Sequence, residues 1–357
     1  MQDSLFASTK PTYDVPSLAE TLASPTYATA ISTFSGCGGS SLGLRRAGFK
    51  VIQASEFVPA ARETYQANFP NTAVDARDIR EVDALEWLDA HGLRPGELDL
   101  FEGSPPCSSF SASNVGETKH EVHAYSDGIK QRTDDLFDEW LRLLEVIRPR
   151  ACVAENVTGI WRGEAYDYFL TITKRLGDLG YNVEPRILNA AAFGAATARP
   201  RTIIQAVRKD VGFPKWPAMT VDEPYTLRDA IETCSPSPQE ELDAMNFEGY
   251  AIEPEWRKLG YGGQSERYFN LIRPRWDAPL PTITQTGGQN GSASVTHPDE
   301  PRKFTPTEVA WISGFPRDFV FTGNVRQRYE RVGRAVPPPL YAAVGSAMIR
   351  VLTGGAA

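Results

Sequence analysis

The chain has 357 residues, of which 41% are apolar and 23% are charged. These values are typical of a globular protein and exclude an intrinsically disordered one, and the length predicts about two domains. The formal net charge of −8 argues against a uniformly basic protein that coats nucleic acid. A local basic surface is still compatible with this total, because eight basic and three acidic residues follow Pro301.

The cysteines and the hydropathy pattern limit which kinds of site and which location in the cell the sequence predicts. The four cysteines, Cys37, Cys107, Cys152 and Cys234, form no pair with metal-ligand spacing and no disulfide framework, so no metal site is expected. The first 20 residues lack a basic stretch followed by an apolar one, and no run of 18 apolar residues occurs. We therefore expect a cytoplasmic protein that does not contact a membrane.

Residues 1–28 are rich in Ser, Thr, Pro and Ala and predict a flexible arm. From residue 29 to 208, short apolar runs alternate with helical patterns, which predicts an α/β fold with a doubly wound, mostly parallel sheet. The predicted strands are Thr29–Phe34, Val51–Ser55, Leu98–Phe101, Ala151–Ala154 and Thr202–Val207. The predicted helices are Leu42–Ala47, Pro59–Asn68, Asp134–Ile147 with Thr133 as its cap, Tyr166–Leu179, Thr305–Ser313 and Leu340–Leu352.

The pattern changes after Arg208. Residues 209–280 contain many prolines and little regular alternation, which predicts a smaller, irregular domain. Regular helical pattern returns in residues 281–357, so this segment is expected to complete the first domain.

Polar motifs follow several predicted strands. The turn Phe34-Ser-Gly-Cys-Gly-Gly39 lies where a strand passes into a helix, and Glu56 follows the next strand. Glycines at such a turn let a ligand approach backbone N–H groups, and an acidic residue after the second strand can bind ribose hydroxyls. Asp78 could mark the adenine end of the same ligand. The spacing does not match the dinucleotide fingerprint, so each signal is weak alone.

A second set of motifs is more specific. Cys107 directly follows two prolines at the end of a predicted strand, which suits a nucleophile presented to a cleft. Glu155 ends the next strand, and Arg199 and Arg201 stand just before another. A buried inert thiol is the commoner fate of a single cysteine, but the ordered set favours a catalytic role.

These blocks together resemble the DNA cytosine-5 methyltransferase family, from about residue 29 to the end. The matching blocks are FSGCGG at 34–39, Glu56-Phe57, Asp78-Ile79, SPPCSSFS at 104–111, Glu155-Asn156-Val157, Arg199-Pro-Arg201, PTIT at 281–284, GFP at 314–316 and VGRAVPP at 332–338. The resemblance implies a class I, Rossmann-like methyltransferase whose residues 209–280 form the target-recognition domain.

The resemblance also implies roles for individual residues. Cys107 is expected to add to C6 of a cytosine flipped out of double-stranded DNA, with Glu155, Arg199 and Arg201 binding the base. The residues expected to bind the S-adenosyl-L-methionine-type donor are Phe34, Ser35, Gly36, Cys37, Gly38, Gly39, Glu56, Phe57, Asp78, Ile79, Pro105 and Arg334. Residues 108–132 are expected to form a loop that closes over the site.

Arg334 departs from the family pattern, which has asparagine there. A guanidinium about 4 Å from a sulfonium would repel it by about 4 kcal/mol, so an anion is expected nearby. The sequence therefore predicts carboxy-S-adenosyl-L-methionine as the donor and 5-carboxymethylcytosine as the product, with ordinary S-adenosyl-L-methionine as the alternative. Thr197, where the family often has glutamine, and the small size of the recognition domain are further departures.

The leading hypothesis is thus a bacterial or phage-encoded enzyme, acting as a monomer on C5 of cytosine in DNA, as in restriction-modification. Action on RNA is a second hypothesis within the same chemistry. A catalytically inactive DNA-binding module is an alternative from another class, but the joint presence of Cys107, Glu155 and both arginines argues against it. A nucleotide-dependent oxidoreductase is a further alternative, and it leaves the Pro105-Pro106-Cys107 motif unexplained.

Overall fold

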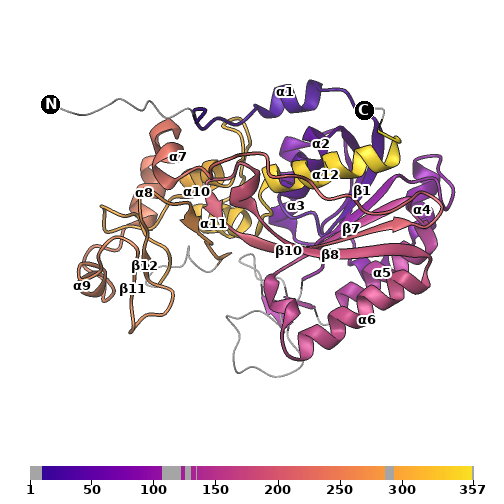
Figure 1. The fold of residues 1–357 in the computed structure, drawn as a ribbon. Coiled ribbons are helices and arrows are strands. Elements are labelled where there is room, and N and C mark those ends of the chain that lie inside the picture. The colour runs from indigo at the N-terminus through magenta and orange to yellow at the C-terminus, as the bar shows by residue number, and fades with distance from the viewer. Residues whose placement is uncertain (1–9, 107–121, 125–129, 134, 286–292, 356–357) are drawn as a thin grey trace.

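The computed structural model describes residues 10–106, 122–124, 130–133, 135–285 and 293–355. Their largest element is a sheet of seven strands in the order β3-β2-β1-β4-β7-β10-β8 (Figure 1). The strands are β1 (Ala28–Thr33), β2 (Phe49–Ser55), β3 (Ala73–Asp75), β4 (Leu100–Gly103), β7 (Ala151–Asn156), β8 (Tyr181–Asn189) and β10 (Pro200–Arg208).

The sheet is mostly parallel, as predicted. Strands β1, β2, β3, β4 and β7 are parallel to one another, whereas β10 is antiparallel to both β7 and β8. The chain order reverses between β1 and β4, where the sheet has its topological switch point. Ligands of open α/β sheets bind beside the carboxyl ends of the strands at such a point.

Helices cover both faces of the sheet (Figure 1). On one face, α2 (Gly39–Arg46) and α12 (Pro338–Leu352) pack over an apolar core that includes Leu44, Phe49 and Val344. On the other face lie α4 (Ala84–Ala90), α5 (Leu136–Ile147) and α6 (Glu164–Asp178). The core beneath them contains Trp140, which stacks on Phe101 at 5.4 Å.

Helix α5 was predicted from the sequence, but it begins two residues later than expected. It begins at Leu136 after Asp135 as its N-terminal cap residue, whereas the sequence predicted Thr133 as the cap of a helix from Asp134. The predicted closing loop contains a short antiparallel pair, β5 (Val122–Ala124) and β6 (Lys130–Arg132). Its other residues, up to position 129, lie outside the described ones.

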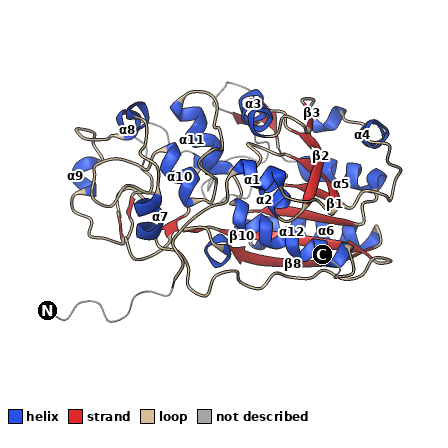
Figure 2. Ribbon diagram, turned by 90° about the horizontal axis from the view of Figure 1, so that it is seen from above, coloured by secondary structure: helices blue, strands red, loops and turns tan. Residues whose placement is uncertain are grey.

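The segment after Arg208 folds into small elements at one end of the sheet (Figures 1 and 2). They are α7 (Leu227–Thr233), α8 (Gln239–Met245), α9 (Glu253–Trp256), β11 (Gly263–Gln264) and β12 (Ile272–Arg273). Phe247, Ile252, Trp256 and Leu271 form a separate small core there. The parallel pair β13 (Leu280–Pro281) and β9 (Thr197–Ala198) then returns the chain to the body around the sheet.

The C-terminal segment is mostly helical and contains α10, α11 and α12. α10 (Pro306–Ile312) and α11 (Val325–Arg334) lie between the small elements and the sheet, near α3 (Pro59–Asn68), and α12 follows α11 (Figure 2). By length and composition the helical stretch Val325–Leu352 could cross a membrane. However, 67% of its most apolar window is buried inside the protein, which is typical of a core helix.

The N-terminal segment differs from the predicted flexible arm over residues 10–27. Tyr13, Val15 and Leu18 are buried, and Leu18–Ala23 forms α1. The Tyr13 hydroxyl donates to the Trp311 carbonyl at 2.7 Å, and Lys10 pairs with Asp229. The prediction of a flexible arm relied on a composition rich in Ser, Thr, Pro and Ala. A few separate apolar side chains are enough to anchor this segment, and composition does not reveal them.

Candidate active site

A cavity of about 720 Å³ opens at the switch point of the sheet. It is bordered by the segments that follow β1, β2, β4 and β7, by residues 282–285 and by the end of α11. This volume suits a nucleotide-sized ligand. Of the residues predicted to form the site, those lining the cavity are Phe34, Ser35, Gly36, Cys37, Gly39, Glu56, Phe57, Ile79, Pro105, Glu155, Arg199, Arg201 and Arg334.

The glycine-rich turn forms one wall. Phe34 has a φ of 53° and Gly38 a φ of 94°, so the chain turns sharply between β1 and α2. A side chain at Gly39 would come within 2.5 Å of the Val336 carbonyl oxygen, which explains why glycine is required where α2 begins. The turn thereby brings its backbone close to the end of α11.

The Glu56 side chain binds the backbone of the glycine turn. Its carboxylate accepts the Gly36 N–H at 2.7 Å and the Val58 N–H at 2.8 Å. Burial raises the pKa of Glu56, and these two hydrogen bonds oppose that shift. A carboxylate has about four acceptor positions, so capacity for ribose hydroxyls remains beside these contacts.

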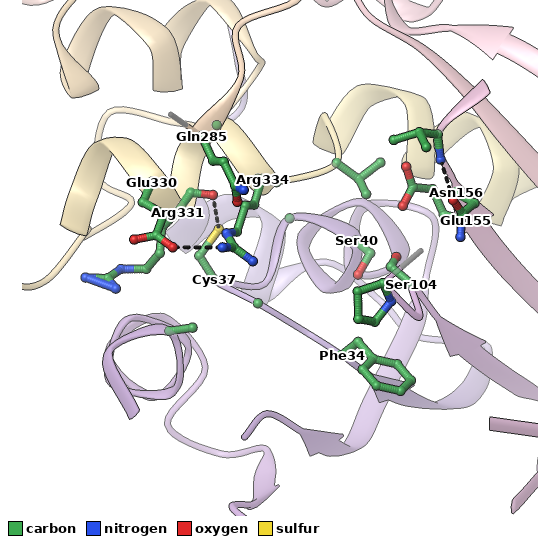
Figure 3. Close-up of a pocket in the computed structure, with 18 of the residues that line it drawn as sticks. Phe34, Cys37, Ser40, Ser104, Glu155, Asn156, Gln285, Glu330, Arg331 and Arg334 are labelled. Atoms are coloured by element: carbon green, nitrogen blue, oxygen red, sulfur yellow. Dashed lines mark hydrogen bonds and ion pairs between the residues drawn. The ribbon is translucent and has the colours of Figure 1, made fainter. Parts of the chain in front are cut away.

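Glu155 lies at the opposite end of the cavity, at the end of β7 (Figure 3). Its carboxylate pairs with the Arg201 guanidinium at 2.9 Å, and burial raises the pKa of Glu155 although Arg201 and Arg199 lower it. The neighbouring Asn156 donates to the Pro105 carbonyl at 3.1 Å. This bond fixes the chain that leads into residue 107.

Arg199 is placed differently from Arg201. Its two terminal nitrogens donate to the carbonyls of Ile283 at 2.8 Å and Gly333 at 2.7 Å, and the side chain is buried. Arg199 therefore ties the end of α11 to residues 282–285. The structure brings both predicted arginines to the cavity, but only Arg201 contacts Glu155.

The cysteines are distinguished by their surroundings. Cys37 lines the cavity, but burial raises the pKa of its thiol to about 12, so this sulfur stays protonated at neutral pH. Cys152 is buried within strand β7, and Cys234 is half-buried at the end of α7. Cys107, the predicted nucleophile, lies outside the described residues. Pro105 and Pro106, which directly precede it, line the cavity.

Arg334 lines the cavity near Cys37 and forms an ion pair with Glu330 (Figure 3). The two groups are 2.9 Å apart and one helical turn apart on α11. Glu330 also lines the cavity. The anion expected beside Arg334 is therefore present in the protein itself, as Glu330.

Two predicted donor residues do not line the cavity. Gly38 turns the chain behind it, and a side chain there would meet Phe69 at 2.5 Å. Asp78 accepts hydrogen bonds from Arg80 and from Gln131 at 3.0 Å, next to Ile79, which does reach the cavity. Both residues support the wall.

Several basic side chains of the C-terminal segment are buried or form ion pairs within the protein. Arg302, Lys303 and Arg331 are buried, and Arg302 pairs with Glu308 at 2.8 Å. Arg328 pairs with Glu241 at 3.3 Å. The local excess of positive charge in the sequence thus does not translate into an equally basic surface.

Sequence reasoning missed several residues of the cavity. Ser40, Ser104 and Glu330 line it, as does Phe269, whose side chain is 79% exposed. The spacing of four between Glu330 and Arg334 was a usable signal for an ion pair on a helix. Ser104 is the first residue of the SPPCSSFS block but was not singled out, and no local pattern marks Ser40 or Phe269. Among the described residues, no group of three or more His, Cys, Asp or Glu is placed to hold a metal ion.

Comparison with known proteins identifies the family. The model of the C-5 cytosine-specific DNA methylases matches residues 28–350. The chain belongs to this family. It is 31% identical to the type II methyltransferase M1.HphI of Haemophilus parahaemolyticus, over 91% of this chain and 87% of that protein. It is 30% identical to the type II methyltransferase M.Eco47II of Escherichia coli, over 93% and 81%.

Solved structures share the fold of this C-5 cytosine-specific DNA methylase. A DNA modification methyltransferase encoded within an E. coli prophage has a TM-score of 0.69 at 21% identity, covering 92% of this chain and 100% of that one. The S. pombe Dnmt2 methyltransferase has a TM-score of 0.63 at 19% identity, covering 90% and 98%. The predicted class I methyltransferase fold is confirmed.

Proposed function

We propose that this DNA cytosine-5 methyltransferase uses Cys107 as its nucleophile, Glu155 and Arg201 as its base-binding groups and the glycine turn with Glu56 as its donor site. One observation carries the proposal. A single cavity contains the Glu155–Arg201 pair at one end, the Pro105-Pro106 approach to Cys107, and the glycine turn at the other end. The two halves of a group-transfer site therefore share one cavity.

The chemistry requires that C5 of cytosine become nucleophilic. Addition of the Cys107 thiolate to C6 breaks the aromatic ring and places electron density on C5. Glu155 would contact N3 and the exocyclic amine, where charge changes during this addition, while Arg201 holds the carboxylate in place. Loss of the C5 proton and elimination of Cys107 then restore the ring.

The residues of the donor site suit a ligand that has a nucleoside and a sulfonium group. Glu56 provides a carboxylate beside the glycine turn for ribose hydroxyls, and Phe34 provides an aromatic ring (Figure 3). When bound, the donor supplies the electrophilic carbon that C5 attacks. Arg199 would act as a positioning residue, because it holds the Gly333 carbonyl next to Arg334.

We infer that the donor is S-adenosyl-L-methionine, because Glu330 neutralises Arg334 and removes the repulsion that argued for a carboxylated donor. Carboxy-S-adenosyl-L-methionine remains a second candidate. It is favoured by the position of Arg334, which lines the cavity with about one third of its side chain exposed and within reach of a ligand carboxylate.

Covalent trapping tests the catalytic proposal. DNA containing 5-fluorocytosine should form a stable adduct with the protein in the presence of donor, because fluorine at C5 cannot leave as a proton does. The adduct should be lost in Cys107→Ser and strongly reduced in Glu155→Gln. Cys234→Ser, which changes a cysteine outside the cavity, is the matched control. An adduct that persists in Cys107→Ser would refute the assignment.

Nucleoside mass spectrometry tests the donor. DNA incubated with each donor separately should contain 5-methylcytosine, or 5-carboxymethylcytosine if the second candidate is right. Arg334→Asn should leave the methyl product and abolish any carboxymethyl product. Carboxymethylcytosine formed at the faster rate by the unaltered protein would overturn the inference for S-adenosyl-L-methionine.

The remaining features of the proposal concern the whole enzyme. We propose that residues 29–208 and 281–357 form the catalytic domain, that residues 209–280 form the target-recognition domain, and that the enzyme acts as a cytoplasmic monomer on double-stranded DNA. The exposed Phe269 supports this division, because it projects from the second segment and lines the same cavity as Glu155. Exposed apolar side chains of this kind insert between bases in other DNA-binding proteins.

A further inference from the structure

A second acidic residue, Glu102, lies beside the glycine turn and has no part in the mechanism above. It belongs to β4, and none of its surface is exposed. The Ser32 hydroxyl donates to its Oε2 at 2.6 Å, whereas its Oε1 has no hydrogen-bond partner among the described residues. Burying a carboxyl group with a single partner costs free energy, so stability does not explain why β4 contains one.

Two hydroxyl groups connect Glu102 with the wall of the cavity. Ser32 is paired with Glu102 between the parallel strands β1 and β4, and it is completely buried. The Ser35 hydroxyl lies 3.0 Å from the Ser32 hydroxyl and 3.1 Å from the Ser32 carbonyl oxygen. Ser35 lines the cavity, although only 5% of its surface is exposed. A chain of hydrogen bonds therefore leads from Glu102 through Ser32 to Ser35.

The direction of these hydrogen bonds follows from the number of protons. A serine hydroxyl has one proton and two acceptor positions. Because the Ser32 proton is bound by Glu102, Ser35 must be the donor in the contact between the two hydroxyls. The Ser35 proton therefore points towards residue 32, and the Ser35 oxygen is left to accept from a ligand. Without Glu102, the Ser32 proton could turn to Ser35 and occupy an acceptor position there.

The backbone of Ser35 is held by other contacts. Its N–H donates to the Ser55 carbonyl at 3.2 Å, and its carbonyl accepts the Gly38 N–H at 2.9 Å. These bonds fix the place of Ser35 in the turn, so Glu102 acts on the direction of the hydroxyl proton. A substitution of Glu102 should therefore change the affinity for a ligand without moving the turn.

The order of the strands indicates which part of the donor meets Ser35. Glu56 follows β2 and is the proposed partner of the ribose, whereas Glu155 ends β7 and is that of the cytosine. Ser35 follows β1, which lies between β2 and the β4–β7 half of the sheet. The sulfonium end of the donor must span this interval, because its reactive carbon has to reach the base. At that end the amino group carries N–H donors, whereas the carboxylate carries none.

We propose that Glu102 is a positioning residue that, through Ser32, keeps the Ser35 hydroxyl available as an acceptor for the amino group of the donor. This rests on the proposed function and assigns a contact to the amino-acid part of the donor. An ammonium N–H is a charged donor, so this bond is stronger than one between neutral groups. The role is the same for a charged and a neutral Glu102, because Oε2 can accept in both forms.

The test compares two ligands by titration calorimetry. They are S-adenosyl-L-homocysteine, which retains the amino-acid part, and 5′-methylthioadenosine, which lacks it. We expect Ser35→Ala and Glu102→Met each to weaken binding of S-adenosyl-L-homocysteine by about five- to tenfold and to leave that of 5′-methylthioadenosine unchanged. Adding Ser32→Ala to Glu102→Met should restore most of the affinity, because the proton that competes for Ser35 is then absent. Glu102→Gln keeps an acceptor oxygen and should retain most of the affinity.

Ser237→Ala is the matched control. The Ser237 hydroxyl also contacts another hydroxyl, that of Thr305 at 2.7 Å, but Ser237 is not among the described residues that line the cavity. This variant should bind both ligands as the unaltered protein does, and melting temperatures would identify misfolded variants. Unchanged affinity for S-adenosyl-L-homocysteine in folded Glu102→Met or Ser35→Ala, or an equal loss for both ligands, would overturn this inference. Failure of the unaltered protein to bind either ligand would instead overturn the proposed donor site.

Discussion

The pairing of Arg334 with Glu330 shows how one residue can change the electrostatics of a site. A lone guanidinium in the donor cavity would repel a sulfonium, whereas a neutral ion pair would not. Because both residues are on α11, one helical turn apart, the pair forms without any ligand. The same local arrangement leaves a carboxylated donor able to compete with Glu330 for the arginine.

Glu102 gives a residue-scale prediction for stability. Its pKa is raised from 4.5 to about 7 in the folded protein, so the folded state binds a proton more tightly than the unfolded chain does. Below about pH 4.5 both states are protonated and the carboxyl costs nothing. As pH rises towards 7 only the unfolded chain ionises, and stability falls. Glu102→Gln should therefore raise the free energy of unfolding by up to about 3 kcal/mol at pH 8 and by little at pH 4.5.

Denaturant unfolding at both pH values measures this difference. Glu248→Gln, which changes an exposed glutamate, is the control and should show almost no dependence on pH. An equal effect of Glu102→Gln at both values would show that Glu102 is not held neutral in the folded protein.

At the scale of elements, helix α2, which begins at the glycine turn of the cavity, packs closely against α12. Helix α2 begins at the glycine turn, and α12 carries Tyr341. Their close approach depends on Gly43, where an added Cβ would lie 2.5 Å from the Tyr341 Cβ and 2.6 Å from the Pro338 carbonyl oxygen. Helix backbones can approach this closely only where a side chain is absent.

Gly43→Ala should therefore destabilise the protein by about 1–3 kcal/mol, because α2 and α12 must separate. Gly177→Ala in α6 is the matched substitution, since an added Cβ there meets nothing within 4 Å. It should stabilise the protein by up to about 1 kcal/mol through helix propensity. Chemical denaturation would measure both, and a harmless Gly43→Ala would contradict the close contact.

At the scale of the whole molecule, the N-terminal segment joins parts that are distant in sequence. Tyr13 packs edge-on against Trp311 at 5.5 Å and against Tyr225 at 5.0 Å, while its hydroxyl bonds the Trp311 carbonyl. α10 and the start of the 209–280 segment thus share one anchor.

Tyr13→Phe should lower the free energy of unfolding by about 1 kcal/mol, because it removes one buried hydrogen bond and leaves the carbonyl without this donor. Tyr27→Phe is the control, since Tyr27 is 58% exposed and should have almost no effect. The shift in denaturation midpoint measures both. An unchanged midpoint for Tyr13→Phe would show that the hydroxyl does not stabilise the fold.

The amino-acid sequence by itself determined the family, the α/β class and most strands and helices near the cavity, because apolar periodicity and short motifs are local properties. β7 and β10 were predicted within two residues at each end, whereas β8 was missed because its partly exposed residues do not alternate clearly. Only the tertiary structure decided which partners the polar groups take. Arg199 binds the Gly333 carbonyl and Glu102 accepts from the Ser32 hydroxyl because the sheet and α11 bring distant segments together, and such contacts leave no periodic trace in the sequence.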